Sequence, residues 1–516
     1  MSIRSSKVTT LRALKEEGRL LEWQDNFSLC YGLFNLIHPG HLRYFQTAKQ
    51  YGSRLVVALR GDSMLSEVQR RECFAETERA RAVAALELID NVIILDSGGL
   101  EDLVSLTKPK TLILGTEFEK ERSREVGEAV NRIHDYDGRV IYEAGETHYA
   151  SAHLFLGRQD EIEDGRSRQF RTALSSQAID LSKVLLSLRK TPGPNMLVLG
   201  DTIVDRYVAC DPIGMSSEAP VIVVKELESR DFLGGAGIVA AHIAALGGEC
   251  TYISVTGEDV HADFVKDRLI EYQVKAKLFV DKSRPTTRKI RYMVENQKLF
   301  RVSRLKEHRL PRDVEDLIVE KILELAPCLN SIVVADFVYG VITPRILEIL
   351  QVVSKDYDIQ LYGDLQCSSQ VGNIAKFRNF KLLCPTEREA RIALNNQDDG
   401  VEYVANLLMT ETSSSNLVLK LGGDGFIAYS RDINNNFVYR QHFPALTINP
   451  VDVAGAGDSL LAGVSVGLAQ GLSLMEASAL GCCVAALAVQ SVGNNPVNYQ
   501  AVRTFIEQQE LDSNAI

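Results

Sequence analysis

The sequence lacks several features that would mark a secreted, metal-binding or membrane protein. Its nine cysteines include no C-x-x-C pair and no metal-ligand spacing, so we expect reduced thiols and no zinc. The first twenty residues are charged and lack the apolar core of a signal peptide, so we expect a cytosolic protein. The most apolar stretch, 460–492, is interrupted by Gln470 and Glu476 and predicts two buried helices.

The chain also lacks an excess of basic residues. Its formal net charge of -11 argues against a general nucleic-acid-binding protein, which needs a clustered basic surface, but not against nucleotide binding. With 516 residues, 45% hydrophobic and 24% charged, the chain is ordinary in composition but too long for one core. We therefore expect two domains.

Residues 27–156 alternate short apolar runs, such as FSLCYGLF and RLVVALRG, with helical patterns, such as HLRYFQTAKQYG. This alternation predicts a parallel sheet with helices on both faces, in a Rossmann-like domain. From about residue 158 to 194, a charged run, an amphipathic segment and TPGPN predict a linker and an opening helix. The expected boundaries are 1–160 for the first domain, 161–194 for the linker and helix, and 195–516 for the second domain.

The second domain again alternates strand and helix patterns, from NMLVLGDTIVDRY to its end. Stretches such as APVIVVKEL and RKIRYMVENQKLFRV alternate with period two, which predicts antiparallel strands in a small lid beside a parallel sheet. The expected fold class is therefore α/β in two domains, the second an αβα domain with a small β lid.

Residues 452–463, DVAGAGDSLLAG, carry the strongest chemical signal. The Gly-rich stretch permits close backbone approach to a ligand, and the apolar run after Asp458 predicts a helix whose free N–H groups face an anion. Asp458 can then accept the proton of a hydroxyl that attacks the γ-phosphoryl group of ATP. The alternative is that Asp458 only caps the helix.

This stretch resembles a known family. VAGAGDSLLAG is similar to the carboxy-terminal signature of the ribokinase-like, or phosphofructokinase-B (PfkB), sugar kinases, and FLGGAGIVAAHIAALGG to their amino-terminal signature. LVLGDTIVDRY, followed by SSEAPVIVVKE, is similar to the heptose 7-phosphate kinase half of the bifunctional heptose kinase/adenylyltransferases. The residues that this resemblance implies are the base Asp458, the sugar-binding Asp205, Gly234 and Gly235, and the nucleotide- or phosphate-binding Gly422, Gly425, Gly455, Ala456 and Gly457.

Two positions depart from this resemblance. Ile238 stands where the family has an Asn three positions after the second glycine, and it cannot hydrogen-bond a sugar. Asp364-Leu365-Gln366 replaces D-P-K, which removes a cation near phosphate. Both departures leave the identity of the sugar open.

The segment HPGH, residues 38–41, follows an apolar run and precedes a helical pattern. His38 and His41 would then stand at the carboxyl edge of a sheet beside a helix N-terminus, where open α/β sheets bind nucleotides. Imidazoles there can donate hydrogen bonds to phosphate oxygens, and Gly40 lets the α-phosphate approach the backbone. The alternatives are ordinary turn histidines or a zinc site, and the zinc site lacks partner ligands nearby.

This stretch resembles the H-x-G-H nucleotidyltransferases, among them the glycerol-phosphate cytidylyltransferases. YGLFNLIHPGHLRYFQTAKQYG, FAETERARAVAALELIDNVIILD and KPKTLILGTEF are similar to successive segments of that family. The resemblance implies Mg2+ and attack of a sugar phosphate on the α-phosphate of ATP, with CTP as the alternative. The implied residues are the catalytic His38 and His41 and the nucleotide- or phosphate-binding Gly32, Phe34, Gly40 and Ser151.

This second match also has departures. Asn35 stands where the family has Asp, and the Lys after the second strand is missing, with Arg70 and Arg71 nearest. The late triphosphate motif is reduced to HYASAHLFLGR, in which Ser151 and Arg158 are usable. Two alternatives therefore stay open: a CTP-using enzyme fused to a kinase for another sugar, and a half-active protein in which one domain only binds nucleotide.

Further acids lie at predicted strand ends and helix starts. Asp201 shares a strand region with Asp205 and either binds sugar or caps a turn, and Asp336 either places Mg2+ or phosphate or forms a turn. Glu387 matches a family position in the metal and phosphate region, or is an ordinary first-turn acid. The basic stretch 283–292 either faces the acceptor's phosphate or is a solvated strand edge.

Together these patterns predict a bifunctional enzyme that makes a nucleotide-activated sugar. We expect the ribokinase-like domain to phosphorylate a sugar phosphate, heptose 7-phosphate at the anomeric position, and the first domain to transfer an adenylyl group onto the product. The resemblance implies ADP-heptose supply for lipopolysaccharide. The expected partners are sugar phosphate, nucleoside triphosphate and further copies of the chain in a homo-oligomer, without nucleic acid or membrane.

Overall fold

The computed structural model divides the chain into two compact units. One comprises residues 1–149 and 396–406, and the other residues 150–395 and 407–516. The structure describes residues 7–17, 27–35, 37, 39–65, 70, 73–115, 118, 124–136, 138–143, 159–189, 192–218, 221–294, 297–367, 372–432, 437–447 and 449–514. His38, Arg71, Ser151 and Arg158, which the sequence analysis singles out, lie outside these residues.

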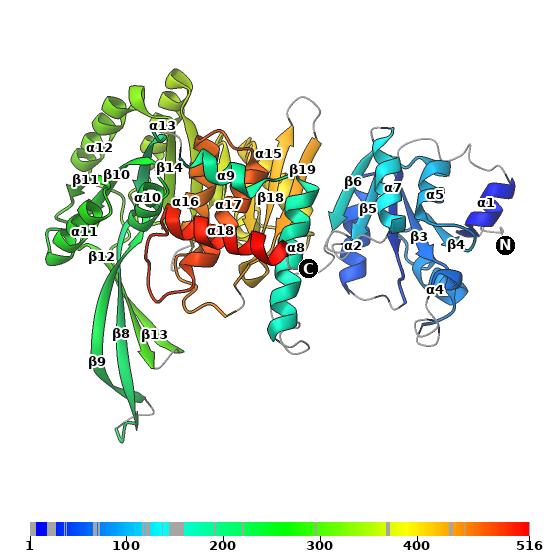
Figure 1. The fold of residues 1–516 in the computed structure, drawn as a ribbon, viewed down its shortest axis with the longest axis horizontal. Coiled ribbons are helices and arrows are strands. Elements are labelled where there is room, and N and C mark those ends of the chain that lie inside the picture. The colour runs from blue at the N-terminus through cyan, green and yellow to red at the C-terminus, as the bar shows by residue number, and fades with distance from the viewer. Residues whose placement is uncertain are drawn as a thin grey trace. The chain divides into compact units, whose positions relative to one another are not determined.

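The first unit is built on a six-stranded parallel sheet (Figure 1). Its strands, in spatial order, are β1 (Val8–Thr10), β4 (Asn91–Leu95), β3 (Arg54–Arg60), β2 (Phe27–Gly32), β5 (Thr111–Gly115) and β6 (Arg139–Glu143). Its helices include α1 (Leu11–Glu17), α2 (Pro39–Lys49), α4 (Glu76–Ala84), α5 (Leu100–Thr107) and α7 (Arg124–His134).

Successive residues of these strands face opposite sides of the sheet, as strand geometry requires. Leu29 and Ile93 pack with α1, α5 and α7 in one apolar core, whereas Cys30 and Val92 pack with α2 and α4 in another. The parallel sheet with a core on each face confirms the predicted fold class of this unit.

The second unit contains a nine-stranded sheet and a separate four-stranded sheet. The large sheet runs, in spatial order, β11 (Lys275–Val280), β10 (Glu249–Thr256), β7 (Asn195–Gly200), β14 (Ser331–Asp336), β15 (Gln360–Leu365), β16 (Leu382–Leu383), β17 (Asn416–Lys420), β18 (Phe426–Asp432) and β19 (Phe437–Phe443). It is parallel from β11 to β17 and antiparallel from β17 to β19.

Helices cover this sheet (Figure 1). They include α8 (Gln159–Ser176), α9 (Leu181–Ser187), α10 (Ala236–Ala245), α11 (Val260–Glu271), α12 (Arg312–Leu325), α13 (Pro344–Tyr357), α14 (Glu387–Leu394), α16 (Ala456–Ala469), α17 (Leu474–Ala488) and α18 (Tyr499–Asn514). The helix α15 (Val401–Thr412) begins in residues grouped with the first unit and ends in residues of the second. The apolar stretch 460–492 forms α16 and α17, whose side chains are mostly buried, as predicted. Across the part of the chain that the structure describes, every helix is too short or too polar to span a bilayer.

The segment expected to contain a linker forms α8 and α9, which belong to the second unit. Phe170 of α8 and residues of α9 lie in the core of that unit. The guanidinium of Arg166 donates to the carbonyl oxygens of Gly423, Ala445 and Thr447 over 2.9 to 3.0 Å. The charged run therefore forms a helix with one buried side, which is the usual pattern of a surface helix.

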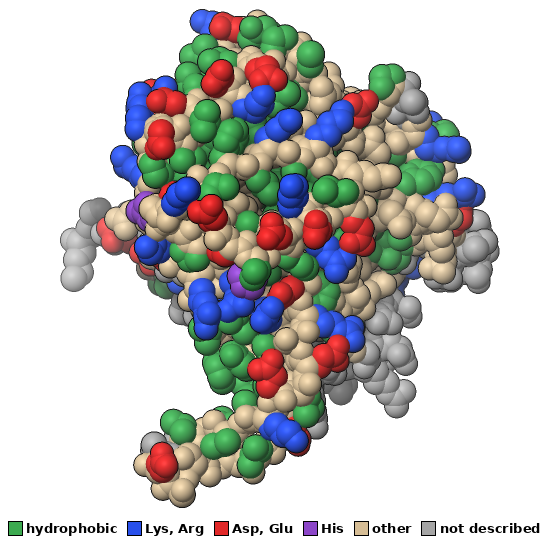
Figure 2. Space-filling model, turned by 90° about the vertical axis from the view of Figure 1, so that its left-hand side faces the viewer, with side chains coloured by type: hydrophobic (Ala, Val, Ile, Leu, Met, Phe, Trp, Pro, Cys, Tyr) green, Lys and Arg blue, Asp and Glu red, His purple; other side chains and the backbone are tan. Residues whose placement is uncertain are grey.

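The four-stranded sheet is the lid, in the order β13 (Gln297–Arg304), β12 (Thr287–Val294), β8 (Thr202–Met215) and β9 (Ile222–Gly235). The hairpin β8–β9 projects from the unit, and exposed apolar side chains such as Ile213 and Leu227 lie along it (Figures 1 and 2). The prediction of antiparallel strands holds for β8–β9 and β12–β13 but is wrong for β8–β12, which pair in parallel. Between β9 and β12 the chain forms β10 and β11 of the large sheet. It then enters the lid again as β12, which runs in the same direction as β8.

Candidate active sites

Asp458 lies in the first turn of α16, near the carboxyl ends of β15 and β17. Gly455 precedes this helix with a φ of +81°, a conformation that glycine adopts readily. Asp458 is 5% exposed, and Nε2 of Gln366, the residue after β15, donates a hydrogen bond to its Oδ1 over 2.5 Å. Gly455, not Asp458, is the N-cap, so the interpretation of Asp458 as a simple cap is wrong.

The surroundings of Asp458 raise its pKa from 3.8 to about 7. Burial is the main cause, and the negative charge of Asp364 adds to it, while the positive charge of Lys420 and the Gln366 hydrogen bond oppose it. A carboxylate with a pKa near neutrality can take up and release a proton under ordinary conditions, as a general base must.

Asp205, the residue expected to bind sugar, lies on β8 and is 4% exposed. Its Oδ1 forms an ion pair with Arg291 of β12, and its Oδ2 accepts a hydrogen bond from Nδ2 of Asn494 over 2.9 Å. A methyl group added at Gly234 would lie 2.1 Å from Oδ2, so this carboxylate keeps its position only beside glycine. Gly235, with a φ of +61°, turns the chain from β9 into α10.

Asn494 is a site residue that the sequence analysis missed. Its side chain is buried between Asp205 and Gly455, where a methyl group added at Gly455 would lie 2.5 Å from Oδ1 of Asn494. Ile238, at the family's Asn position, is fully buried in the apolar core of the unit. The amide beside Asp205 therefore comes from a different part of the chain, which no local spacing reveals.

Asp201 holds the backbone of the loop that follows β14. Its carboxylate accepts hydrogen bonds from the N–H groups of Phe337 over 2.8 Å and of Tyr339 and Val341 over 3.4 Å. Burial raises the pKa of Asp201, and the charge of nearby Asp336 adds to the rise. Of the two alternatives for Asp201, these contacts favour the loop-holding role over sugar binding.

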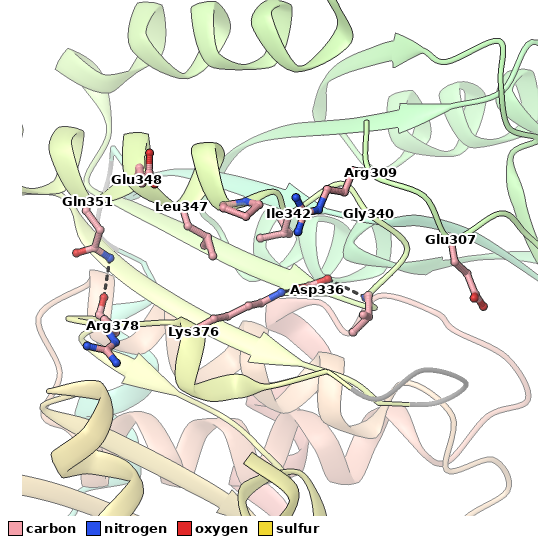
Figure 3. Close-up of a pocket in the computed structure, with 12 residues that line it drawn as sticks. Glu307, Arg309, Asp336, Gly340, Ile342, Leu347, Glu348, Gln351, Lys376 and Arg378 are labelled. Carbon is pink, nitrogen blue, oxygen red and sulfur yellow. Dashed lines mark hydrogen bonds and ion pairs between the residues drawn. The ribbon is translucent and has the colours of Figure 1, made fainter. Parts of the chain in front are cut away.

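Asp336 ends β14 and borders a cavity of about 570 Å3, where it faces Lys376 (Figure 3). Nζ of Lys376 pairs with Oδ2, and the Val338 N–H donates to Oδ1 over 2.7 Å. Glu387, in the first turn of α14, instead pairs with Arg391 of the same helix over 2.8 Å. Each of the two carboxylates expected near metal or phosphate therefore already binds a cationic side chain.

The carboxylates near Asp336 show whether the residues present could hold Mg2+. In the residues described, no three His, Cys, Asp or Glu side chains converge to hold a metal ion. Mg2+ keeps several waters and is usually bound by one or two carboxylates together with substrate phosphates, so it needs no such cluster. The donor set is thus compatible with an ion that arrives with ATP, and such an ion would have to replace Lys376 at Oδ2 of Asp336 to use that carboxylate.

The turn between β17 and β18 contains Gly422 and Gly425, which the sequence places against ATP. Both have positive φ, +64° and +90°, and a methyl group at Gly425 would lie 2.1 Å from the carbonyl oxygen of Phe443. Arg166 binds the carbonyl of Gly423 within the same turn. The turn is tight and needs glycine, as a backbone contact to nucleotide would require.

Two ion pairs of the second unit were not predicted, one buried and one between a buried aspartate and an exposed lysine. Nζ of Lys420 lies 2.7 Å from Oδ2 of Asp364, and Nζ of Lys298 on β13 lies 2.9 Å from Oδ1 of Asp452. Burial acts to raise the pKa of Asp452, but hydrogen bonds from Lys298 and Tyr207 hold it below its usual range. In the sequence, Lys420 is the charge that ends the otherwise apolar run NLVLK, and it begins the region 420–425 that the family resemblance places against ATP.

The helix α14 contributes a second acid, Glu389, and its negative charge, not that of Glu387, raises the pKa values of Asp364 and Lys420. Glu389 is buried, its Oε1 accepts the Cys367 N–H over 3.0 Å, and its charge raises the pKa of Lys420. Both acids lie in the first turn of α14, so sequence position alone does not distinguish them.

In the first unit, His41 and Gly40 lie in the first turn of α2. Phe34 follows β2 with a φ of +48°, and its ring packs edge-on against the imidazole of His41, with 5.2 Å between the ring centroids. A methyl group added at Gly32 would lie 2.8 Å from the Phe34 ring. Gly32, Phe34, Gly40 and His41 therefore lie close together, where a sheet edge meets a helix N-terminus.

Arg79 of α4, which the sequence analysis missed, organises the backbone beside His41. It is 1% exposed, and its guanidinium binds four acceptors at 2.7 to 3.0 Å: the carbonyls of Leu33, Arg60 and Phe74 and Oδ1 of Asp62. Oδ1 of Asn35 accepts the Phe74 N–H over 2.8 Å, and Arg70 donates to the Asp62 carbonyl over 3.2 Å. Asn35 and Arg70 thus both contact the loops around this edge of the sheet.

Two family models match the chain, one in each unit. Residues 194–499 match the pfkB family carbohydrate kinases, and residues 29–154 match the cytidylyltransferase-like family. Phosphofructokinase-2 from Escherichia coli, solved in complex with substrates and products, superposes with a TM-score of 0.52 at 16% identity, covering 61% of this chain and 99% of that one. The second unit therefore shares that fold.

Curated relatives of the chain include proteins named bifunctional protein HldE. The one from Campylobacter jejuni subsp. doylei is 28% identical over 317 residues, which is 60% of this chain and 64% of that protein. The one from Syntrophotalea carbinolica is 31% identical over 322 residues, 61% of this chain and 64% of that protein. The chain thus spans about 64% of the length of these relatives. Because the match over residues 194–499 covers more than half of the chain, the chain belongs to the pfkB family of carbohydrate kinases, and it carries a cytidylyltransferase-like unit before the kinase fold.

Proposed function

We propose that the chain is a bifunctional enzyme, in which the second unit phosphorylates a sugar phosphate and the first transfers a nucleotidyl group onto the product. The observation that carries the proposal is the buried Asp458, whose pKa is about 7, at the Gly-rich N-terminus of α16. The family match and the two HldE relatives support the pairing of activities.

In the proposed kinase step, Asp205 and Asn494 orient the sugar, and Asp458 removes the proton of the attacking hydroxyl. The sugar oxygen forms a bond to the γ-phosphorus of ATP as the bond to the bridging oxygen breaks, and ADP leaves. The backbone N–H groups at the start of α16 stabilise the charge on the transferred group. Bound Mg2+ would neutralise charge on the phosphates.

In the proposed transfer step, an oxygen of the sugar 1-phosphate attacks the α-phosphorus of the nucleoside triphosphate, and pyrophosphate leaves. His41, together with His38, donates hydrogen bonds to the phosphate oxygens as negative charge builds up there. Gly32, Gly40 and Ser151 are the proposed phosphate contacts. The proposed nucleotide is ATP and the proposed sugar is heptose 7-phosphate, as in ADP-heptose formation.

The test combines both steps in one reaction mixture. The full chain is incubated with ATP and D-glycero-D-manno-heptose 7-phosphate, then with ATP or CTP, and the products are identified by mass spectrometry. We expect Asp458→Asn to lose the bisphosphate, and His41→Ala to make the bisphosphate but no nucleotide-linked sugar. If the wild type makes neither product, the heptose assignment fails.

A second candidate is a CTP-using first unit coupled to a kinase for another sugar. Residues 29–154 match a family described as cytidylyltransferase-like, which favours CTP as the nucleotide to test beside ATP. The same reaction run with each triphosphate separates the two candidates by the mass of the nucleotide-linked product.

A further inference from the structure

Lys420, the last residue of β17, is a buried charge to which the proposed mechanism gives no role. It is 9% exposed, and its only counter-ion among the ion pairs of the described residues is Asp364, at 2.7 Å. Burying an ammonium group is costly even when it is paired, and apolar replacements of such pairs are often as stable. Stability alone therefore gives a weak reason for this pair.

The ammonium of Lys420 lies against the Gly-rich turn of α16. A methyl group added at Gly457 would lie 3.3 Å from Nζ of Lys420 and 4.0 Å from Nε2 of Gln366. The same Nε2 donates to Oδ1 of Asp458 over 2.5 Å. The lysine and the carboxylate of Asp458 therefore both lie beside the first turn of α16, around the space that a side chain at Gly457 would take up.

Three acids and one lysine lie around this space, and the pKa values of two of the acids and of the lysine are shifted. Asp364, Glu389 and Asp458 are the acids, and burial raises the pKa of Asp364 to about 6 and that of Asp458 to about 7. Burial acts to lower the pKa of Lys420, but Asp364 and Glu389 outweigh it and raise the value. Lys420 thus stays positively charged at every pH at which Asp458 changes its protonation.

We infer that Lys420 is a catalytic residue of the proposed phosphoryl transfer, whose ammonium binds the γ-phosphoryl oxygens of ATP while the sugar oxygen attacks. The inference rests on the proposed function. The new bond joins the sugar oxygen to the γ-phosphorus, the bond from that phosphorus to the β,γ-bridging oxygen breaks, the hydroxyl proton passes to Asp458, and ADP leaves. Lys420 keeps its proton throughout. Its positive charge stabilises the negative charge that moves from the γ-phosphoryl oxygens to ADP.

The experiment uses the full chain with the substitution Lys420→Met, which keeps the length of the side chain and removes its charge. We expect kcat for phosphorylation to fall 100- to 1,000-fold, as when a donor to a developing oxyanion is removed, with KM for the sugar within threefold of wild type. Lys275→Met is the matched control, because Lys275 forms an exposed pair with Glu249 at the far edge of the same sheet. It should keep wild-type kcat.

A variant that places the positive charge at another position distinguishes a catalytic role of Lys420 from a structural one. In the Lys420→Met background, Gln366→Lys places a new ammonium at the same space beside Gly457. We expect this double variant to recover at least tenfold in kcat. If Lys420→Met does not fold, Asp364→Asn/Lys420→Met removes both charges together and is measured in its place. A folded variant without the lysine that keeps kcat within threefold of wild type overturns the inference.

A binding measurement keeps this inference distinct from the proposed function. Calorimetry compares the affinities of wild type and Lys420→Met for AMP-PNP and for ADP, which differ in the γ-phosphate. We expect wild type to prefer AMP-PNP and the variant to lose that preference. If wild type phosphorylates no sugar, the proposed function fails, whereas an unchanged AMP-PNP to ADP ratio in the variant overturns the role of Lys420.

Discussion

The pKa of Asp458 makes a quantitative prediction for the pH dependence of the kinase reaction. As a general base, Asp458 must be ionised in the free enzyme, so kcat/KM should rise with pH through a midpoint near 7. At pH 6 about a tenth of the molecules carry the ionised form, and kcat/KM should fall about tenfold for each further pH unit. The assay is initial-rate ADP release with saturating ATP from pH 5 to 9.

The charges that shift the pKa of Asp458 provide a control for this prediction. The charge of Asp364 raises the pKa of Asp458, and Lys420 lowers it. Asp364→Asn removes the first effect and leaves the second, so the midpoint should move below that of wild type even if the maximal rate drops. A profile that is flat from pH 5 to 8 in wild type, or a midpoint that rises in Asp364→Asn, would refute Asp458 as the base.

The carboxyl group of Asp458 also affects the free energy of unfolding. The rise from 3.8 to about 7 corresponds to about 4 kcal/mol, which is an upper bound for the stability that the neutral carboxyl gives. Because the folded pKa is raised, this contribution is fully present below pH 4 and is lost as the pH rises through 7. Asp458→Asn should therefore raise the midpoint of thermal unfolding more at pH 8 than at pH 5, and an equal effect at both would contradict the assignment.

Three further substitutions test other parts of the structure. Gly455→Ala forces a methyl group to within 2.5 Å of Oδ1 of Asn494 and a φ of +81° on alanine, so it should cost about 1–3 kcal/mol and abolish kinase activity, measured by denaturant unfolding and ADP release. Arg79→Met leaves four acceptors without their donor and should destabilise the first unit by about 3–5 kcal/mol, seen as a lower urea midpoint for that unit. His41→Ala should reduce pyrophosphate release at least 100-fold while leaving ADP release unchanged, and a parallel loss of both would argue against separate sites.

Local patterns in the sequence were enough to predict the fold class and the position of Asp458. Apolar runs of strand length between helical patterns indicated the parallel sheets, and a Gly-rich turn before an apolar helix indicated where the proposed base lies. The turn glycines were likewise predictable, because Gly422, Gly425 and Gly455 have conformations that side chains rarely adopt. These features depend on neighbours in the chain.

Contacts between distant segments could not be predicted in the same way. Lys420 and Asp364 meet because β17 and β15 lie on either side of the two-residue β16, and one sequence does not reveal the spatial order of parallel strands. Asn494 reaches Asp205 from the far end of the chain, and Arg79 joins three loops. The parallel pairing of β8 with β12 was missed because a period-two pattern predicts a strand but not its direction.

The helices α8 and α9 bear on how such a two-unit protein can be assembled by gene fusion. Phe170 lies in the kinase core, and Arg166 holds the turn at Gly423, so the exchangeable module is longer than the catalytic fold that begins at β7. A recombination joint placed at Asn195 would remove α8 and α9, which uncovers the apolar residues that they pack against and frees the turn at Gly423 from Arg166. A joint before Gln159 keeps both helices with the kinase fold, so the module retains the helices that cover its apolar core.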